Sequence, residues 1–176
     1  MKFFSAIAGM CLVGMATAVD MAKYSAEKGV EPEFQTYLKE LYASAEDPAS
    51  TTGFTDRFTP AGQLIVLANT AKGAKEILAL KRQLLPTEGN KHWNHFPNVT
   101  SVDSESSAQK VYQVLGVIET TYDQGNCSAA YYSSRFTVTK DNSGAVQLNT
   151  YKGTLVAYDD FVVHPDVTPT AIECGI

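Results

Sequence analysis

The spacing of apolar residues predicts two helices in the first half of the chain. In the first, they recur every three or four positions and so share one face: Phe34, Tyr37, Leu38, Leu41 and Tyr42. Pro32 suits the first turn of this helix, and Asp47-Pro48 should follow its end. Residues 49–62 are polar and turn-rich, with room for one helical turn, and residues 63–67 read as a short strand. A second helix is expected over residues 69–85, because its leucines and isoleucine have helical spacing and Pro86 stops it.

The second half of the chain has the pattern of long strands. It is rich in Val, Tyr, Phe and Thr over residues 93–102, 110–122, 129–140 and 146–163. Polar turns separate these segments, and Asn142 and Gly144 suit a hairpin turn. Helices followed by strands predict an α+β fold, in which N-terminal helices pack on a curved antiparallel sheet. Such a sheet has a concave side, and if the helices cover it incompletely, a cone-shaped pocket remains there for a ligand.

The N-terminal residues indicate export. Residues 1–18 combine a basic start, a short apolar run and Ala16-Thr17-Ala18, which is the pattern of a secretory signal peptide. No later segment approaches the length of a transmembrane helix. We therefore expect a secreted, extracellular protein with an N-terminal arm over residues 19–31. One domain should cover residues 32–164, followed by a tail over residues 165–176.

The cysteines and sequons agree with that compartment. Removal of the signal peptide leaves Cys127 and Cys174, which would pair in an oxidising environment and tie down the tail. The chain-entropy model makes such a bridge worth roughly 4 kcal/mol. The alternative is two free thiols. Asn98 and Asn126 each begin a glycosylation sequon, which requires their side chains to face water.

Charge and motifs exclude several classes of function. The formal net charge is −5, and no basic run of four occurs, so nucleic acid and anionic membranes are not expected partners. The sequence lacks the nucleophile elbow of serine hydrolases, the phosphate-binding glycine loop, the dinucleotide fingerprint and the zinc-protease motif. We therefore expect no cofactor and no metal.

The stretch KHWNHFPNVT contains two of the three histidines and the only tryptophan. Alternate residues of a strand point to opposite faces, so His92 and His95 do not form a metal pair there. If Asn98 faces water, His95 faces inward, and Trp93 shares its face. A bulge at Pro97 would alter this count.

The chain resembles the nuclear-transport-factor-like superfamily, specifically its SnoaL-like branch and the small secreted members found in filamentous fungi. The resemblance is carried by the segments LYASAEDP, FTDRFTPAGQLIVL, KGAKEILALKRQLLP, HWNHFPNVTSV and YQVLGVIETTY, in this order over residues 30–163. This superfamily includes polyketide cyclases, scytalone dehydratase and ketosteroid isomerase, and also proteins that only bind ligands or dimerise. The fold therefore does not give the function by itself.

The resemblance implies that His95 acts as a general base beside a carbonyl, with Asp56 or Glu119 as its carboxylate and a tyrosine such as Tyr42 polarising the carbonyl. The expected pocket lining, from strand alternation, is Trp93, Tyr112, Tyr132, Ser134 and Phe136. Each candidate also has a structural interpretation. His95 is equally a histidine held by hydrogen bonds inside the wall, Tyr42 completes the apolar helix stripe, and Asp56 can pair with Arg57 or cap a turn. Glu119 is equally a solvated strand residue, and Asp159-Asp160 is expected to be a surface pair.

Three functions follow from these features. The first is a secreted domain that binds a small apolar or aromatic molecule in the pocket. The second is a cofactor-free cyclase, dehydratase or isomerase that uses His95. The third is an extracellular interaction module that forms a homodimer through the outer face of the sheet.

Overall fold

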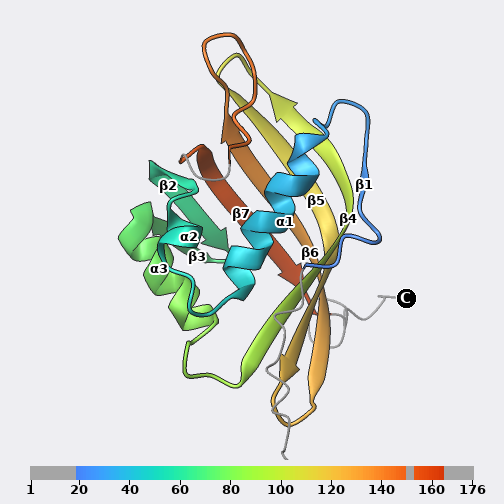
Figure 1. The fold of residues 1–176 in the computed structure, drawn as a ribbon, viewed down its shortest axis with the longest axis vertical. Coiled ribbons are helices and arrows are strands. Elements are labelled where there is room, and N and C mark those ends of the chain that lie inside the picture. The colour runs from blue at the N-terminus through green and yellow to red at the C-terminus, as the bar shows by residue number, and fades with distance from the viewer. Residues whose placement is uncertain (1–18, 150–152, 165–176) are drawn as a thin grey trace, which may run out of the picture.

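A computed structural model describes residues 19–149 and 153–164, which form one curved sheet with three helices on one side (Figure 1). The predicted signal peptide and the predicted C-terminal tail, including Cys174, lie outside the described residues. The elements, in chain order, are β1 (Ser25–Ala26), α1 (Glu33–Glu46), α2 (Thr52–Thr55), β2 (Phe58–Val66), β3 (Asn69–Lys72), α3 (Gly73–Leu84), β4 (Lys91–Glu105), β5 (Gln109–Tyr122), β6 (Cys127–Thr139) and β7 (Leu155–Val163). None of the described helices is long and apolar enough to span a membrane.

Helix α1 follows the predicted pattern and crosses the concave side of the sheet in front of β5, β6 and β7 (Figure 1). Pro32 occupies its N-cap, and the chain leaves the helix at Asp47 in an extended conformation, since Pro48 disfavours the α region for the residue before it. The buried face of α1 comprises the predicted stripe extended by one turn: Phe34, Tyr37, Leu38, Leu41, Tyr42 and Ala45. Their burial against the sheet forms the main core of the domain.

The second helix is shorter than its apolar spacing predicts. Asn69–Lys72, expected in the helix, instead form β3 and pair antiparallel with the end of β2. The helix begins at Gly73, whose φ of +72° turns the chain out of the strand. Leu67 also adopts a positive φ at the β2–β3 turn.

Within the described residues, the sheet has the strand order β1-β4-β5-β6-β7-β2-β3. The expected antiparallel sheet is in fact mixed, because β1 pairs with β4 and β2 pairs with β7 in parallel. The central pairs β4–β5, β5–β6 and β6–β7 are antiparallel, as predicted. The last strand begins at Leu155 rather than at residue 146, since Val146 makes only an isolated bridge to Lys140 after the turn at Gly144.

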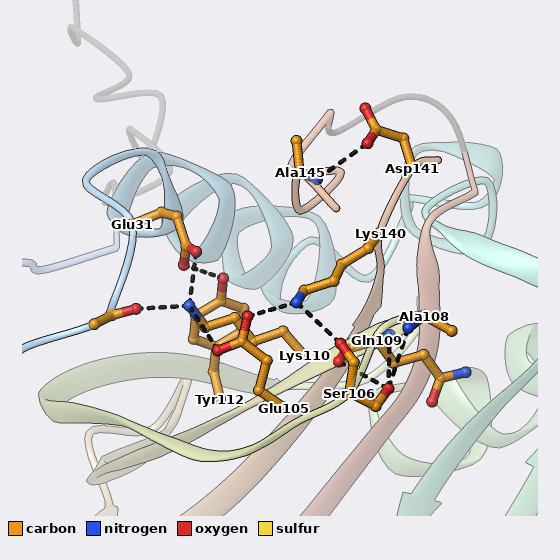
Figure 2. A network of polar contacts seen from close by, with 11 residues as sticks. Glu31, Glu105, Ser106, Ala108, Gln109, Lys110, Tyr112, Lys140, Asp141 and Ala145 are labelled. Carbon is orange, nitrogen blue, oxygen red and sulfur yellow. Dashed lines mark hydrogen bonds and ion pairs between the residues drawn. The ribbon is translucent and has the colours of Figure 1, made fainter. Parts of the chain in front are cut away.

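The N-terminal end of α1 is fixed to the sheet by a polar network (Figure 2). The Lys110 ammonium, almost fully buried on β5, donates to the Gly29 carbonyl at 2.6 Å and to Glu31 Oε1 at 2.7 Å. The Tyr112 hydroxyl donates to the other oxygen of the Glu31 carboxylate. Because Glu31 lies two residues before the helix, these contacts set where α1 crosses the strands.

Candidate functional site

A cavity of about 270 Å³ opens between the C-terminal end of α1, helices α2 and α3, and the concave face of the sheet. Its wall is largely apolar and includes Ala45, Phe54, Leu64, Val66, Leu84, Trp93, Ile118 and Val162. The polar groups that line it include Lys81, Lys91, His95, Tyr158, Asp160 and His164. A concave, mostly apolar site with a few convergent polar groups is the usual form of a small-molecule pocket.

His95 lies in the wall of this cavity and is 4% exposed, whereas Asn98 is exposed, which is the orientation that strand alternation predicts. The bulge that Pro97 suggested is present between Pro97 and Val99 and places Asn98 at the irregular position. Beyond the bulge, the buried positions continue at Thr100, so the strand keeps its inner face.

The partner of His95 is Glu46, the last residue of α1. One carboxylate oxygen, Oε1, accepts the His95 backbone N–H at 2.6 Å and contacts Nδ1 at 2.9 Å. Both side chains are almost fully buried. A carboxylate at Nδ1 fixes the ring orientation and favours a proton on that nitrogen, which leaves Nε2 as the acceptor. Nε2 has no hydrogen-bond partner within residues 19–149 and 153–164.

Aromatic rings hold the imidazole on its other sides. The Tyr42 ring stacks on His95 with centroids 4.1 Å apart and planes at 7°, and the Tyr132 ring meets it edge-on at 5.6 Å. Tyr132 lies over Gly116, where an added Cβ would come within 2.5 Å of its hydroxyl oxygen. Burial raises the pKa of Tyr42 well above its ordinary value, with further contributions from Tyr132 and Tyr158. These rings therefore position the histidine and do not supply an ionisable acid at neutral pH.

A second carboxylate reaches the cavity from β7. Asp160 is 8% exposed, so the expected surface pair Asp159-Asp160 is wrong for this residue. The Ser134 hydroxyl donates to Asp160 Oδ1 at 2.6 Å. Burial raises the pKa of Asp160, while the Ser134 hydrogen bond and the nearby His95 act in the opposite direction. A carboxyl group held toward its protonated form can donate a hydrogen bond to a ligand oxygen.

The remaining predicted site residues lie away from this centre. Asp56 is exposed at the end of α2, and Glu119 lies on the outer face of β5, paired with Asn94. Neither contacts His95. Trp93 lines the cavity as expected, but Tyr112 and Phe136 are core residues because α1 covers them. Phe34 stacks on Tyr112 at 3.9 Å. Tyr132 and Ser134 contact His95 and Asp160, respectively, without lining the cavity.

Sequence reasoning missed Glu46 and Asp160. A signal for each was present: Glu46 lies four residues after Tyr42 and so shares its helical face, and Asp160 alternates with Tyr158 and Val162 on one strand face. What the pattern lacks is the packing of the C-terminal end of α1 against β4, which brings together residues 49 positions apart.

The residues expected to carry export chemistry are at the surface. Asn98 and Asn126 are exposed, and Cys127, at the start of β6, is exposed and forms no disulfide with another described residue. Its expected partner, Cys174, lies outside the described residues. His92 is exposed and pairs with Asp123 at 2.7 Å. No group of three or more His, Cys, Asp or Glu residues that could hold a metal occurs in the described ranges.

No protein-family model matches the sequence, and no curated protein is similar to it. Solved structures are similar in fold. A protein from Catenulispora acidiphila in complex with S-DNPA has a TM-score of 0.56 at 14% identity, covering 76% of this chain and 92% of that one. Aln2 from a Streptomyces species has a TM-score of 0.56 at 15% identity, covering 78% and 95%. An NTF2-like protein with a cystatin-like fold from Novosphingobium aromaticivorans has a TM-score of 0.50 at 17% identity, covering 78% and 85%.

At these identities the likeness concerns the fold alone. It confirms the predicted α+β architecture, which is the cystatin-like fold of the similar proteins from Caulobacter vibrioides and Novosphingobium aromaticivorans.

Proposed function

We propose that this protein binds a small apolar or aromatic molecule in the cavity lined by Trp93 and His95. The observation that carries the proposal is a largely apolar cavity into which a few buried polar groups converge. Binding in such a site gains from apolar burial, and the polar groups select the orientation of the ligand. A solved structure of similar fold carries the small molecule S-DNPA, which agrees with this use of the fold.

Native mass spectrometry of the purified protein tests this proposal. We expect a retained small molecule in the wild type, lost in Val162→Trp, which fills the cavity. The matched control is Val163→Trp, because the next residue of β7 points to the outer face of the sheet. A wild-type protein that retains no molecule and binds no aromatic probe in calorimetry would contradict the proposal.

The contact between His95 and Glu46 favours a second candidate, acid–base catalysis of the cyclase, dehydratase or isomerase type. Here Nε2 removes a proton beside a ligand carbonyl, Glu46 holds the resulting imidazolium, and the electron pair moves to the carbonyl oxygen as an enolate. Asp160, whose pKa is raised by burial, is the cavity-wall group that would donate a hydrogen bond to that oxygen in its protonated form. Among the residues expected for this role from sequence, only His95 stands in the cavity wall with a carboxylate in contact.

Proton exchange tests the catalytic candidate without knowledge of the natural substrate. An aromatic ketone such as 2-tetralone is incubated in D₂O, and loss of its α-proton signal is followed by NMR. We expect His95→Asn to slow the exchange by about 10²-fold or more, the usual contribution of a general base. Exposed His92→Asn is the control. Equal rates for wild type and His95→Asn leave ligand binding as the function.

We also propose that the protein is secreted and glycosylated, with a disulfide between Cys127 and Cys174. The exposure of Asn98, Asn126 and Cys127 supports this. N-terminal sequencing of protein from the culture medium should begin at Val19. Peptide-N-glycosidase treatment should reduce the mass, and a non-reducing peptide map should join the two cysteine peptides.

The outer face of the sheet supports a homodimer. Leu115, Tyr131 and Phe161 are exposed on adjacent strands, and the strand register places them on the same face. Large exposed apolar side chains grouped on one sheet face are typical of an interaction surface.

A further inference from the structure

Lys81 is a buried cation in the cavity wall with few partners of its own. It lies on α3, is 3% exposed, and lines the cavity. Its ammonium donates to the Asp47 carbonyl at 2.6 Å and lies 5.9 Å from the centre of the Phe54 ring. No carboxylate of residues 19–149 and 153–164 comes within 4.0 Å of it.

The comparison with Lys110 shows what a buried ammonium ordinarily requires. Lys110 is equally buried, but its ammonium donates hydrogen bonds to the Gly29 carbonyl at 2.6 Å and to the Glu31 carboxylate at 2.7 Å. The Glu105 carboxylate also lies 3.8 Å from the same ammonium. An ammonium carries three donors, so Lys81 has two that no described residue accepts. Burial lowers the pKa of Lys81, and the Asp47 carboxylate opposes this from a distance without forming an ion pair. A buried charge that lacks a close counter-ion is costly. Lys81 lines the cavity, so the missing acceptor is expected there.

The other charges of the cavity also favour an anion. Lys91, half-buried over the Trp93 ring, and exposed His164 add basic groups to the lining. Asp160 is the one carboxylate among the described lining residues, against the basic groups of Lys81, Lys91 and His164, and burial raises its pKa. A cavity with this balance attracts acidic ligands, although the chain as a whole is acidic.

We propose that the ligand is an aromatic carboxylic acid and that Lys81 binds its carboxylate. This inference rests on the proposed function, since it specifies the class of molecule that the cavity binds. The bond from Lys81 to the Asp47 carbonyl, near the end of α1, is a favourable C-terminal contact of the helix. That contact occupies one donor and leaves the others directed to the ligand.

A pair of probes with the same ring system tests this inference. Isothermal titration calorimetry at pH 7 compares 2-naphthoate with the neutral 2-naphthamide, and quenching of Trp93 fluorescence reports occupancy of the cavity. We expect 2-naphthoate to bind at least about tenfold more tightly than the amide, the scale of one charge-assisted contact. In Lys81→Met this preference should disappear, with the affinity for the amide unchanged within about twofold. Lys81→Arg should retain part of the preference.

The matched control is Lys75→Met, which removes an exposed ammonium from the same helix and should leave the preference intact. A purely structural role for Lys81 predicts that Lys81→Met weakens acid and amide alike, which would overturn the inference. Equal affinities of the two probes for the wild type would also overturn it and leave the proposed function standing. Failure of both probes, with no retained small molecule, would remove the proposed function as well.

Discussion

At the scale of single residues, the cavity combines groups that burial disfavours. The side chains of His95, Asp160 and Lys81 each have one hydrogen-bonding residue in the described part of the chain: Glu46, Ser134 and Asp47, respectively. Buried polar groups with so few partners reduce the free energy of unfolding compared with apolar residues of similar size. Their presence in one apolar cavity is therefore better explained by ligand chemistry than by folding, since sites of function commonly lower stability.

Asp160 allows this cost to be measured through pH. Because its pKa is raised, the folded state keeps the proton to a higher pH than the unfolded chain does. Stability then falls as the pH rises from about 4 through the folded-state pKa, and the loss is complete above it. Asp160→Asn removes the charge and keeps an oxygen acceptor for Ser134. We expect urea unfolding to show this variant as more stable than wild type at pH 7, with the difference shrinking toward pH 4.

The neighbouring Asp159→Asn provides the control, because position 159 points to the outer face of the sheet. It should show no comparable gain at pH 7. A stability difference between Asp160→Asn and wild type that stays constant from pH 4 to pH 7 would argue against a buried carboxyl group with a raised pKa at position 160.

The extent of what the sequence could predict also differs between residues. Period-two alternation in a strand is local, so it correctly directed His95 and Trp93 inward and Asn98 outward. The carboxylate that contacts His95 depends on how the C-terminal end of α1 packs against β4. No local pattern encodes that packing. Asp56 and Glu119, which are closer to His95 in the sequence, were therefore chosen as candidates, and Glu46 was missed.

At the scale of elements, α1 is the part that builds the site. A carboxylate fixes it at each end: Glu31 binds Lys110 and Tyr112 just before the helix, and Glu46 binds His95 at its last residue (Figure 2 shows the first of these). The apolar stripe between them follows a 3.6-residue period, so the helix was predictable from sequence. Strand β3 was not, because Asn69–Lys72 are mostly polar and become a strand only through pairing with β2.

The first of these two fixed ends can be weakened without touching the cavity. Lys110→Met removes the ammonium that donates to Gly29 and Glu31. We expect the free energy of unfolding to fall by roughly 1–3 kcal/mol, below the usual cost of breaking a buried pair because Glu31 is about a third exposed. Urea denaturation at pH 7 measures this change.

Lys39→Met, on the exposed side of α1, serves as the control and should change stability by about 0.5 kcal/mol at most. Tyr112→Phe should be non-additive with Lys110→Met, because both groups contact one carboxylate. Additive effects, or equal effects of the Lys110 and Lys39 variants, would show that the network does not anchor the helix.

At the scale of the whole molecule, the sheet separates two surfaces. Its inner face holds α1, the core and the cavity, as the ribbon in Figure 1 shows for the helix. Its outer face carries the apolar patch of Leu115, Tyr131 and Phe161. Alternate residues of the same strands serve the two faces, so Val162 lines the cavity and Phe161 points away from it. Ligand binding and association of two chains can therefore be altered independently.

Because the two faces of the sheet are separate, the expected homodimer can be tested by changing the outer face alone. Tyr131 and Phe161 are 60% and 58% exposed, and burying them against a second copy would remove a large aromatic area from water. Analytical ultracentrifugation should show a dimer for the wild type and a monomer for Tyr131→Ser/Phe161→Asp, which introduces a charge into the interface. Thr36→Asp, on the exposed side of α1, should remain dimeric. The double variant should still bind 2-naphthoate as wild type does. A wild-type protein that sediments as a monomer at every concentration tested would refute the homodimer and leave the cavity proposals unaffected.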